Sequence, residues 1–305
     1  MRVCLMVEGQ EGVTWAEWVA LARAAEEAGL EGLFRSDHYS AIFEPVAGSL
    51  DAWATLAGLA ALTSTLRLGT LVSPATFRHP SVLARLATTV DHISAGRVEL
   101  GMGAGWYERD HSENGFPFLD ARARFDLFAE QVEIVVRSWT EEGFDHDGPA
   151  YALHEQTALP QPVQRPHPPL ILGGRAKPRS AALAARFASE YNTLAAPLGE
   201  LRERGRRLDG ACVAVGRDPA TLAYSLMTMC VVGADAGDVA RELARVESQL
   251  GRERSEGWLV GTVDELADQV AELDSVGISR VFLQHMDHRE LGPVALMGEL
   301  VRARR

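Results

Sequence analysis

Cysteine is scarce in this sequence, and the few residues present are too widely spaced to form a disulfide framework. The 305 residues include three cysteines, Cys4, Cys212 and Cys230, with no Cys-x-x-Cys pair. An odd, scattered set of this kind favours a reducing compartment. Long apolar runs are also missing, and the stretch Val3–Val7 is too short for a signal peptide. We therefore expect a cytoplasmic protein that does not enter a membrane.

Positive charge is in short supply as well. Lysine and arginine number 30 against 42 aspartates and glutamates, which gives a formal net charge of −12. A field of this sign repels phosphate backbones, so we expect no nucleic-acid partner. The sequence also contains no Gly-x-Ser-x-Gly segment, which removes the common nucleophile turn of serine hydrolases.

What the sequence does contain is a regular alternation of short β-branched runs and longer amphipathic segments. The short runs predict eight strands, at residues 2–7, 30–35, 66–72, 97–102, 170–172, 190–194, 222–232 and 280–284. The longer segments predict helices at residues 14–29, 50–62, 80–93, 122–139, 180–188, 198–215, 239–250, 262–276 and 291–301. Two of these helices begin with capping boxes, Thr14 with Glu17 and Thr262 with Glu265.

Eight strands alternating with helices predict one α/β domain, residues 1–305, with the (β/α)8 or TIM-barrel fold. An open doubly wound sheet is the alternative. An insertion is predicted after the fourth strand and its helix, where residues 143–153 form a hairpin or loop and residues 160–169 carry five prolines. A second insertion is predicted after the seventh strand. The segments around Gly29 and Gly277 resemble each other, and each is typical of a helix end, a glycine cap and a strand.

In a barrel of this kind, function lies where the strands end and the following loops begin. Asp37 and His38 directly follow the second strand, and an imidazole there can donate a hydrogen bond or move a proton near neutral pH. The alternative is a loop histidine that only caps a helix or bonds the backbone. Gly173 and Gly174, after the fifth strand, either offer amides to a phosphate or simply permit a tight turn.

The segment after the fourth strand is rich in glycine and then aromatic. Residues 101–105, Gly-Met-Gly-Ala-Gly, do not match the Gly-x-Gly-x-x-Gly dinucleotide fingerprint. They either let the backbone approach a planar ligand or shape a turn. Trp106 follows, and it either packs or forms an aromatic wall beside a ligand. The clusters at residues 145–147 and 285–288 lack the convergent acidic strand ends of a barrel metal site, so we predict no metal.

A run through the middle of the chain resembles a known family. It reads Ser-Pro-Ala-Thr-Phe-Arg-His-Pro at 73–80, Ala-Thr-Thr-Val-Asp-His-Ile-Ser at 87–94 and Gly-Arg-Val-Glu-Leu-Gly-Met-Gly-Ala-Gly-Trp-Tyr-Glu at 96–108. Together with Ser-Asp-His at 36–38 and Leu-Ile-Leu-Gly-Gly at 170–174, this run is similar to the bacterial luciferase-like superfamily of flavin- and deazaflavin-dependent oxidoreductases. The resemblance extends over essentially the whole chain.

The resemblance implies a TIM barrel that is usually dimeric and that holds a flavin or deazaflavin ring at its strand ends. Residues 70–73 would form a bulge behind the ring, often with a non-prolyl cis peptide, and the glycine pair at 173–174 would donate N–H groups to the cofactor phosphate. The residues that the resemblance implies in cofactor binding are Asp37, His38, Thr70, Leu71, Ser73, Gly103, Ala104, Gly105, Gly173 and Gly174.

The segments most resemble the subgroup that depends on coenzyme F420. The implied activity is hydride transfer between the deazaflavin F420 and a small organic substrate, with an FMN-dependent monooxygenase as the alternative. His38 is the predicted proton donor or ring partner, Asp37 is predicted to orient it, and Trp106 is predicted to wall the substrate side. We expect a homodimer. A metal-dependent barrel hydrolase and a cofactor-binding protein without turnover are the remaining alternatives.

Overall fold

The computed structural model describes residues 1–43 and 47–303, and its centre is a closed ring of eight parallel strands. Each strand pairs with two neighbours in the order β1, β2, β3, β5, β8, β9, β10 and β12, and β12 pairs again with β1. Their bounds are β1 Arg2–Val7, β2 Gly32–Arg35, β3 Arg67–Thr70, β5 Val98–Gly103, β8 Leu170–Gly173, β9 Glu190–Leu194, β10 Ala223–Val232 and β12 Arg280–His285. The predicted barrel is therefore confirmed.

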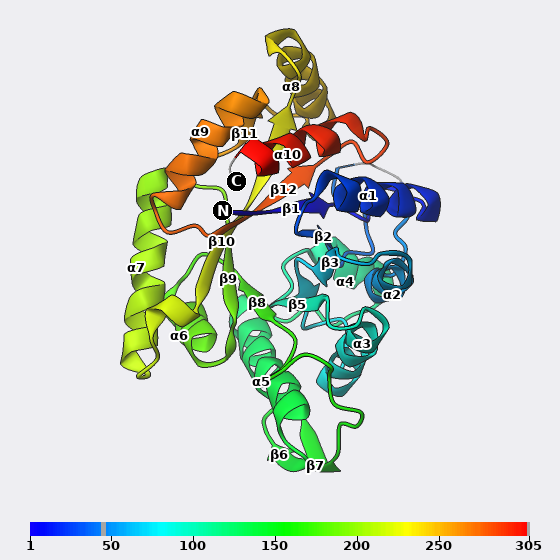
Figure 1. The fold of residues 1–305 in the computed structure, drawn as a ribbon. Coiled ribbons are helices and arrows are strands. Elements are labelled where there is room, and N and C mark those ends of the chain that lie inside the picture. The colour runs from blue at the N-terminus through cyan, green and yellow to red at the C-terminus, as the bar shows by residue number, and fades with distance from the viewer. Residues whose placement is uncertain (44–46, 304–305) are drawn as a thin grey trace.

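Helices surround the ring of strands (Figure 1). They are α1 Trp15–Ala28, α2 Ala52–Leu62, α3 Pro80–Ile93, α5 Ala121–Thr140, α6 Pro178–Phe187, α7 Leu198–Ala214, α9 Val263–Asp274 and α10 Gly292–Ala303. The main hydrophobic core lies between strands and helices, and a smaller one fills the ring with Cys4, Met6, Phe34, Leu71, Ile171 and Phe282. Among the residues that the structure describes, no helix is both long and apolar enough to cross a bilayer.

Local sequence signals explain where several helices begin and end. Both predicted capping boxes form, at the starts of α1 and α9, and they satisfy backbone groups that a helix start leaves free. Gly29 ends α1 with a φ of 76°, a left-handed conformation that glycine adopts without strain. Pro80 occupies the first turn of α3, and the His79 ring accepts a hydrogen bond from the amide of Ser81. This contact gives His79 a capping role.

Both predicted insertions are present. Residues 144–156 form an antiparallel hairpin of β6 Phe144–Asp147 and β7 Ala152–Gln156, which projects beyond α5 in Figure 1. After β10, helix α8 Ala236–Leu250 and strand β11 Leu259–Gly261 precede α9, and β11 pairs with the end of β10. Three elements were not predicted from the sequence: β11, the two-residue strand β4 Ser73–Pro74 and the short helix α4 Glu108–Asn114. All three are too short to show a periodic pattern.

Charged side chains fill the barrel interior at the amino ends of the strands. Arg280, the first residue of β12, is 1% exposed and donates to both carboxylate oxygens of Glu99, at 2.7 and 3.3 Å. It also donates to Glu190 at 3.2 Å, and its guanidinium lies within 5 Å of the Phe34 and Phe282 rings. This charge cluster lies at the amino ends of the strands. The polar residues predicted to be functional lie at the carboxyl ends, at the opposite end of the barrel.

The glycines that end β5 are required by a close approach of backbone segments. A Cβ atom on Gly101 would lie 2.1 Å from the carbonyl oxygen of Thr70, and one on Gly103 would lie 2.6 Å from the Val72 side chain. Val72 also lies 3.5 Å from the position of a Cβ on Gly173. Gly101 and Gly103 therefore make room for the chain after β3, which accounts for these two glycines without any ligand, whereas the contact at Gly173 is an ordinary one.

This close contact gives a test of the barrel packing. The substitution Gly101→Ala places a methyl group against a backbone atom that cannot rotate away, so we expect a loss of about 3 kcal/mol in unfolding free energy. Urea unfolding followed by circular dichroism measures it. The control is Gly210→Ala within α7, where a Cβ meets no atom within 4 Å, and about 0.5–1 kcal/mol of stabilisation is expected. Equal stability of the two variants would contradict this account of Gly101.

Candidate active site

The closed ring brings the predicted site residues to one end of the molecule, because all eight strands are parallel and their carboxyl ends meet there. Asp37 and His38 follow β2, residues 104–106 follow β5, and Gly174 follows β8. The predicted grouping of these segments is therefore what the fold produces, although they lie far apart in the sequence.

His38 is held by an aspartate that the sequence reading did not identify. Its Nδ1 lies 2.5 Å from Oδ2 of Asp110, in α4, and Asp110 is fully buried. The His38 ring meets the rings of Trp106 and Tyr107 edge-on, at centroid distances of 6.0 and 5.8 Å. Within the described residues, Nε2 of His38 has no hydrogen-bond partner, so this nitrogen is the one left for a ligand.

The charges around His38 favour its protonated form. Burial alone would lower the pKa of His38, but the hydrogen bond and the negative charge of Asp110 outweigh burial, and the pKa lies above its usual 6.5. For Asp110, burial would raise the pKa, but the contact with His38 and two backbone amides outweigh burial and lower it. The two groups therefore form a histidine–aspartate pair in which each stabilises the charge of the other.

Asp37 has a different role from the one predicted. It is 1% exposed, and its two carboxylate oxygens accept hydrogen bonds from Arg78 at 2.6 and 3.1 Å and from the Ser73 hydroxyl at 2.6 Å. The prediction that Asp37 orients His38 is wrong, because the Nδ1 partner of His38 is Asp110. Asp37 instead ties the end of β2 to the segment after β3.

That segment contains the predicted cis peptide, between Leu71 and Val72. Thr70 is buried, and its hydroxyl donates to the carbonyl of Gly101 at 2.9 Å. The side chain of Leu71 belongs to the small core inside the ring. The hydroxyl of Ser73 accepts a hydrogen bond from the indole N–H of Trp53 at 3.1 Å. The side chains of these three residues are therefore engaged by the protein itself, and all three residues are buried.

The residues after β5 divide between packing and exposure. Ala104 packs against the main core, and Gly105 has a φ of 76°, which allows the turn into the aromatic pair that follows. Trp106 is 65% exposed, an unusual state for an indole. It lies beside His38 at the end of the barrel that carries the predicted site, so it is available to cover a ligand there.

The glycine pair after β8 is only partly available. The amide of Gly174 donates to the carbonyl of Asn192 at 3.0 Å, and a Cβ on Gly174 would lie 2.6 Å from the Tyr191 hydroxyl. The Gly174 amide therefore does not suit the predicted phosphate contact. The following helix, α6, begins at Pro178 without a side-chain cap, and Arg175 and Lys177 beside it are exposed. The free amides of this first turn suit an anion better.

A buried polar chain links three strand ends at the same face. Gln284 of β12 and Gln10 donate to the two carboxylate oxygens of Glu8, at 2.5 and 2.9 Å. The Ser36 hydroxyl donates to Gln10 at 2.5 Å. In the sequence, Glu8 is recognisable only as a polar residue at a strand end, and its glutamine partners carry no motif. The chain fixes a carboxylate near His38, where Glu8 is one of the negative charges that raise the pKa of that histidine.

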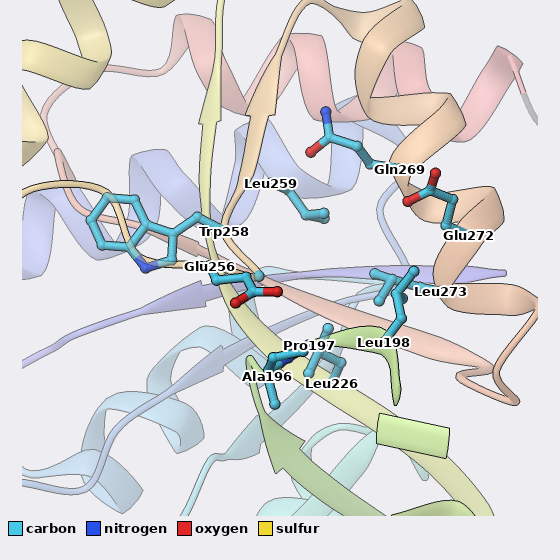
Figure 2. Close-up of a pocket in the computed structure, with 11 residues that line it drawn as sticks. Ala196, Pro197, Leu198, Leu226, Glu256, Trp258, Leu259, Gln269, Glu272 and Leu273 are labelled. Carbon is cyan, nitrogen blue, oxygen red and sulfur yellow. The ribbon is translucent and has the colours of Figure 1, made fainter. Parts of the chain in front are cut away.

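A cavity of about 240 Å³ lies elsewhere, on the outer side of the barrel (Figure 2). Leu226 of β10 lines it and belongs to the outer core, whereas the next residue, Met227, packs inside the ring. Strand β10 therefore separates this cavity from the barrel interior. Its lining residues are Ala196, Pro197, Leu198, Leu226, Glu256, Gly257, Trp258, Leu259, Gln269, Glu272 and Leu273. None of the predicted site residues is among them.

The fold and the gathered strand ends define a (β/α)8-barrel protein with a polar site at the carboxyl ends of its strands. The sequence pattern of the luciferase-like monooxygenase family matches residues 3–257. The chain therefore belongs to this family, as its resemblance predicted.

Curated relatives include an F420-dependent enzyme and a flavin-dependent enzyme. The chain is 30% identical over 218 residues to an F420-dependent hydroxymycolic acid dehydrogenase of Mycobacterium tuberculosis, covering 71% of this chain and 59% of the relative. It is 29% identical over 159 residues to the oxygenase component of a flavin-dependent trigonelline monooxygenase of Acinetobacter baylyi, covering 52% of this chain and 43% of the relative. The matches thus span less than two thirds of these relatives.

Solved structures agree on the fold. An F420-dependent secondary alcohol dehydrogenase, in complex with an F420–acetone adduct, superposes with a TM-score of 0.84 at 18% identity, covering 100% of this chain and 99% of the other. The monooxygenase RslO1 from Streptomyces bottropensis superposes with a TM-score of 0.83 at 24% identity and the same coverage. At these identities the likeness establishes the barrel and not the reaction.

Proposed function

We propose that the protein is an oxidoreductase that holds the deazaflavin F420 at the carboxyl ends of its strands and exchanges hydride with a small organic substrate. The observation that carries the proposal is the His38–Asp110 pair, whose second imidazole nitrogen has no partner among the described residues. The F420-dependent dehydrogenase among the relatives, the one of the two that matches more of this chain, supports the choice of cofactor.

Two places in the structure fit a phosphorylated ring system. Near β2 and β5, the free Nε2 of His38 and the exposed indole of Trp106 offer a proton-transfer group and an aromatic surface. After β8, the uncapped start of α6 beside Arg175 and Lys177 offers amides and positive charge to a phosphate. We therefore assign the phosphate contact to the start of α6 in place of the Gly174 amide.

The residues around this site have distinct roles in the proposed reaction. A bound deazaflavin supplies hydride transfer at carbon five of its ring. His38 supplies the accompanying proton through Nε2, because the hydrogen bond and the charge of Asp110 raise its pKa and favour the protonated ring. Trp106 packs against the substrate and limits the access of water. Asp37, fixed by Arg78, anchors the start of the His38 loop.

The second candidate is an FMN-dependent monooxygenase, and the flavin-dependent trigonelline monooxygenase among the relatives supports a flavin as the cofactor. The two functions differ in their chemistry with oxygen, because reduced flavin reacts readily with it and deazaflavin reacts poorly. Oxygen consumption in the presence of reduced FMN therefore separates them. The homodimer and the cytoplasmic location stay predictions, and light scattering of the purified protein tests the first.

The proposal is tested by titrating the purified protein with F420 and with FMN side by side, following the fluorescence of each cofactor. We expect F420 to bind at least tenfold more tightly, a difference of about 1.4 kcal/mol. A deazaflavin that lacks the phosphate is the matched control, and it should bind more weakly than F420 if the start of α6 holds the phosphate. Tighter binding of FMN together with oxygen uptake would favour the second candidate instead.

A further inference from the structure

Helix α4 holds the loop that carries His38 by several independent contacts. Oδ1 of Asp110 accepts hydrogen bonds from the backbone amides of Tyr39, at 3.0 Å, and Ser40, at 2.7 Å. Oδ2 of the same carboxylate contacts Nδ1 of His38. The hydroxyl of Ser40 also donates to Glu113 at 2.5 Å. A seven-residue helix thus fixes the loop backbone with one carboxylate and orients the imidazole with the same group.

The charge on Asp110 is buried and needs a counter-charge. Removing a carboxylate from water is costly unless it is paired and fully hydrogen-bonded, and two amides cannot supply a full positive charge. Among the described residues, His38 is the one cationic group in ion-pair contact with Asp110. Its side chain is 13% exposed. The pair is therefore balanced when the histidine carries a proton on both nitrogens.

Other charges near the imidazole act in the same direction. Glu8 from the end of β1 and Asp37 from the end of β2 both raise the pKa of His38, and Asp37 is itself paired with Arg78. Burial is the opposing effect, since it favours the neutral ring. Tyr107 contributes an edge-on ring contact. Asp110, in direct contact, therefore makes the decisive contribution.

We propose that Asp110 is a positioning residue that keeps His38 as an imidazolium near neutral pH, with Nε2–H as its outward donor. In this state His38 donates a hydrogen bond or a proton and cannot act as a base. If the proposed function holds, on which this part rests, the ligand atom facing His38 is an acceptor, such as the oxygen of a carbonyl compound that gains hydride at carbon. The proton passes from Nε2 to that oxygen, and solvent then reprotonates His38.

The test uses the protein without cofactor and measures the His38 imidazole by nuclear magnetic resonance. The chain has nine histidines, and the His38 signals are identified by their loss in His38→Gln. In the wild-type protein we expect the His38 pKa to lie above its usual 6.5 and the ring to carry both protons at pH 7. Asp110→Asn removes the charge but keeps a group of the same shape, and it should lower this pKa by about 1–3 units.

Two control variants separate charge from loop structure. Glu113→Gln weakens the grip of α4 on the loop without touching His38, and it should leave the His38 pKa within a few tenths of a unit. Asp268→Asn changes an exposed aspartate of α9 and should have no effect. If Asp110→Asn does not fold, the wild-type titration alone still decides, because a neutral His38 at pH 7 overturns the proposal.

The outcomes also distinguish this proposal from the proposed function. A His38 pKa that falls in Asp110→Asn while F420 fails to bind supports the positioning role and removes the deazaflavin assignment. An unchanged His38 pKa in a protein that binds F420 does the reverse. With F420 bound, Asp110→Asn should lower kcat more than it raises KM, and its rate should fall as the pH rises through the lowered His38 pKa.

Discussion

Replacing Arg280 by methionine is expected to destabilise the protein by about 3–5 kcal/mol, because it leaves Glu99 and Glu190 buried without their shared cation. Both glutamates are at least nine-tenths buried inside the barrel. In the variant, Glu99 keeps its ion pair with Arg67 and Glu190 keeps its ion pair with Arg2. Each of these arginines is more exposed than Arg280, so each compensates a buried charge less well. Urea unfolding at pH 7.5 measures the loss.

The pH dependence of this loss has a defined sign. In the wild-type protein, burial would raise the pKa of Glu99, but Arg280 and Arg67 outweigh burial and lower it. The stability from this shift is present above the pKa of the unfolded chain, near 4.5, and is lost as the pH falls through the lower folded pKa. In Arg280→Met we expect the Glu99 pKa to rise, because its main counter-charge is gone. The unpaired carboxylate then takes up a proton at a higher pH, so the difference between variant and wild type should shrink as the pH falls through that raised pKa.

Two further variants check that the charge imbalance causes the effect. The double variant Arg280→Met with Glu99→Gln should recover part of the loss, since a neutral side chain replaces the unpaired carboxylate. Arg206→Met removes an exposed arginine, paired with Glu203 at 3.3 Å, and should cost less than about 1 kcal/mol. A loss below 1 kcal/mol in Arg280→Met itself would show that Arg67 and Arg2 suffice.

The barrel could be predicted from the sequence because its signals are local and repeated. The start of α1 at a capping box and its end at Gly29 depend on residues within the helix itself. The strands that are buried on both faces appear as short apolar runs between such helices. Once eight of these units follow one another, the closed ring is the compact way to bury them all.

The contacts of the site could not be read in the same way. Asp110 lies 72 residues from His38 in the sequence, in a helix too short for a periodic pattern, and nothing local marks the pair. Arg78 and Asp37 lie 41 residues apart in the sequence. Asp37 was predicted to orient His38, but it pairs with Arg78 instead. The glycines of β5 looked suited to a ligand, but the space they leave is taken by Val72 and by the backbone at Thr70.

Removal of the His38 imidazole should have the largest effect on the catalytic rate. We expect His38→Ala to lower the rate of hydride transfer about 10²–10⁴-fold, the usual contribution of a positioned general acid. The affinity for F420 should change much less, because the phosphate is assigned to the start of α6, which follows β8, whereas His38 follows β2. Oxidation of reduced F420 in single turnovers, with a panel of small aldehydes and ketones, gives the rate. Fluorescence titration gives the affinity.

The matched control is His154→Ala, because His154 is an exposed histidine of β7 in the hairpin, away from the carboxyl ends of the barrel strands. It should turn over like the wild type. Since Asp110 is left without its cation in His38→Ala, that variant should also unfold at lower urea concentration, and the rates must be compared where both proteins are folded. If folded His38→Ala transfers hydride as fast as the control, the proton comes from another group, and the histidine–aspartate pair serves only to order the loop after β2.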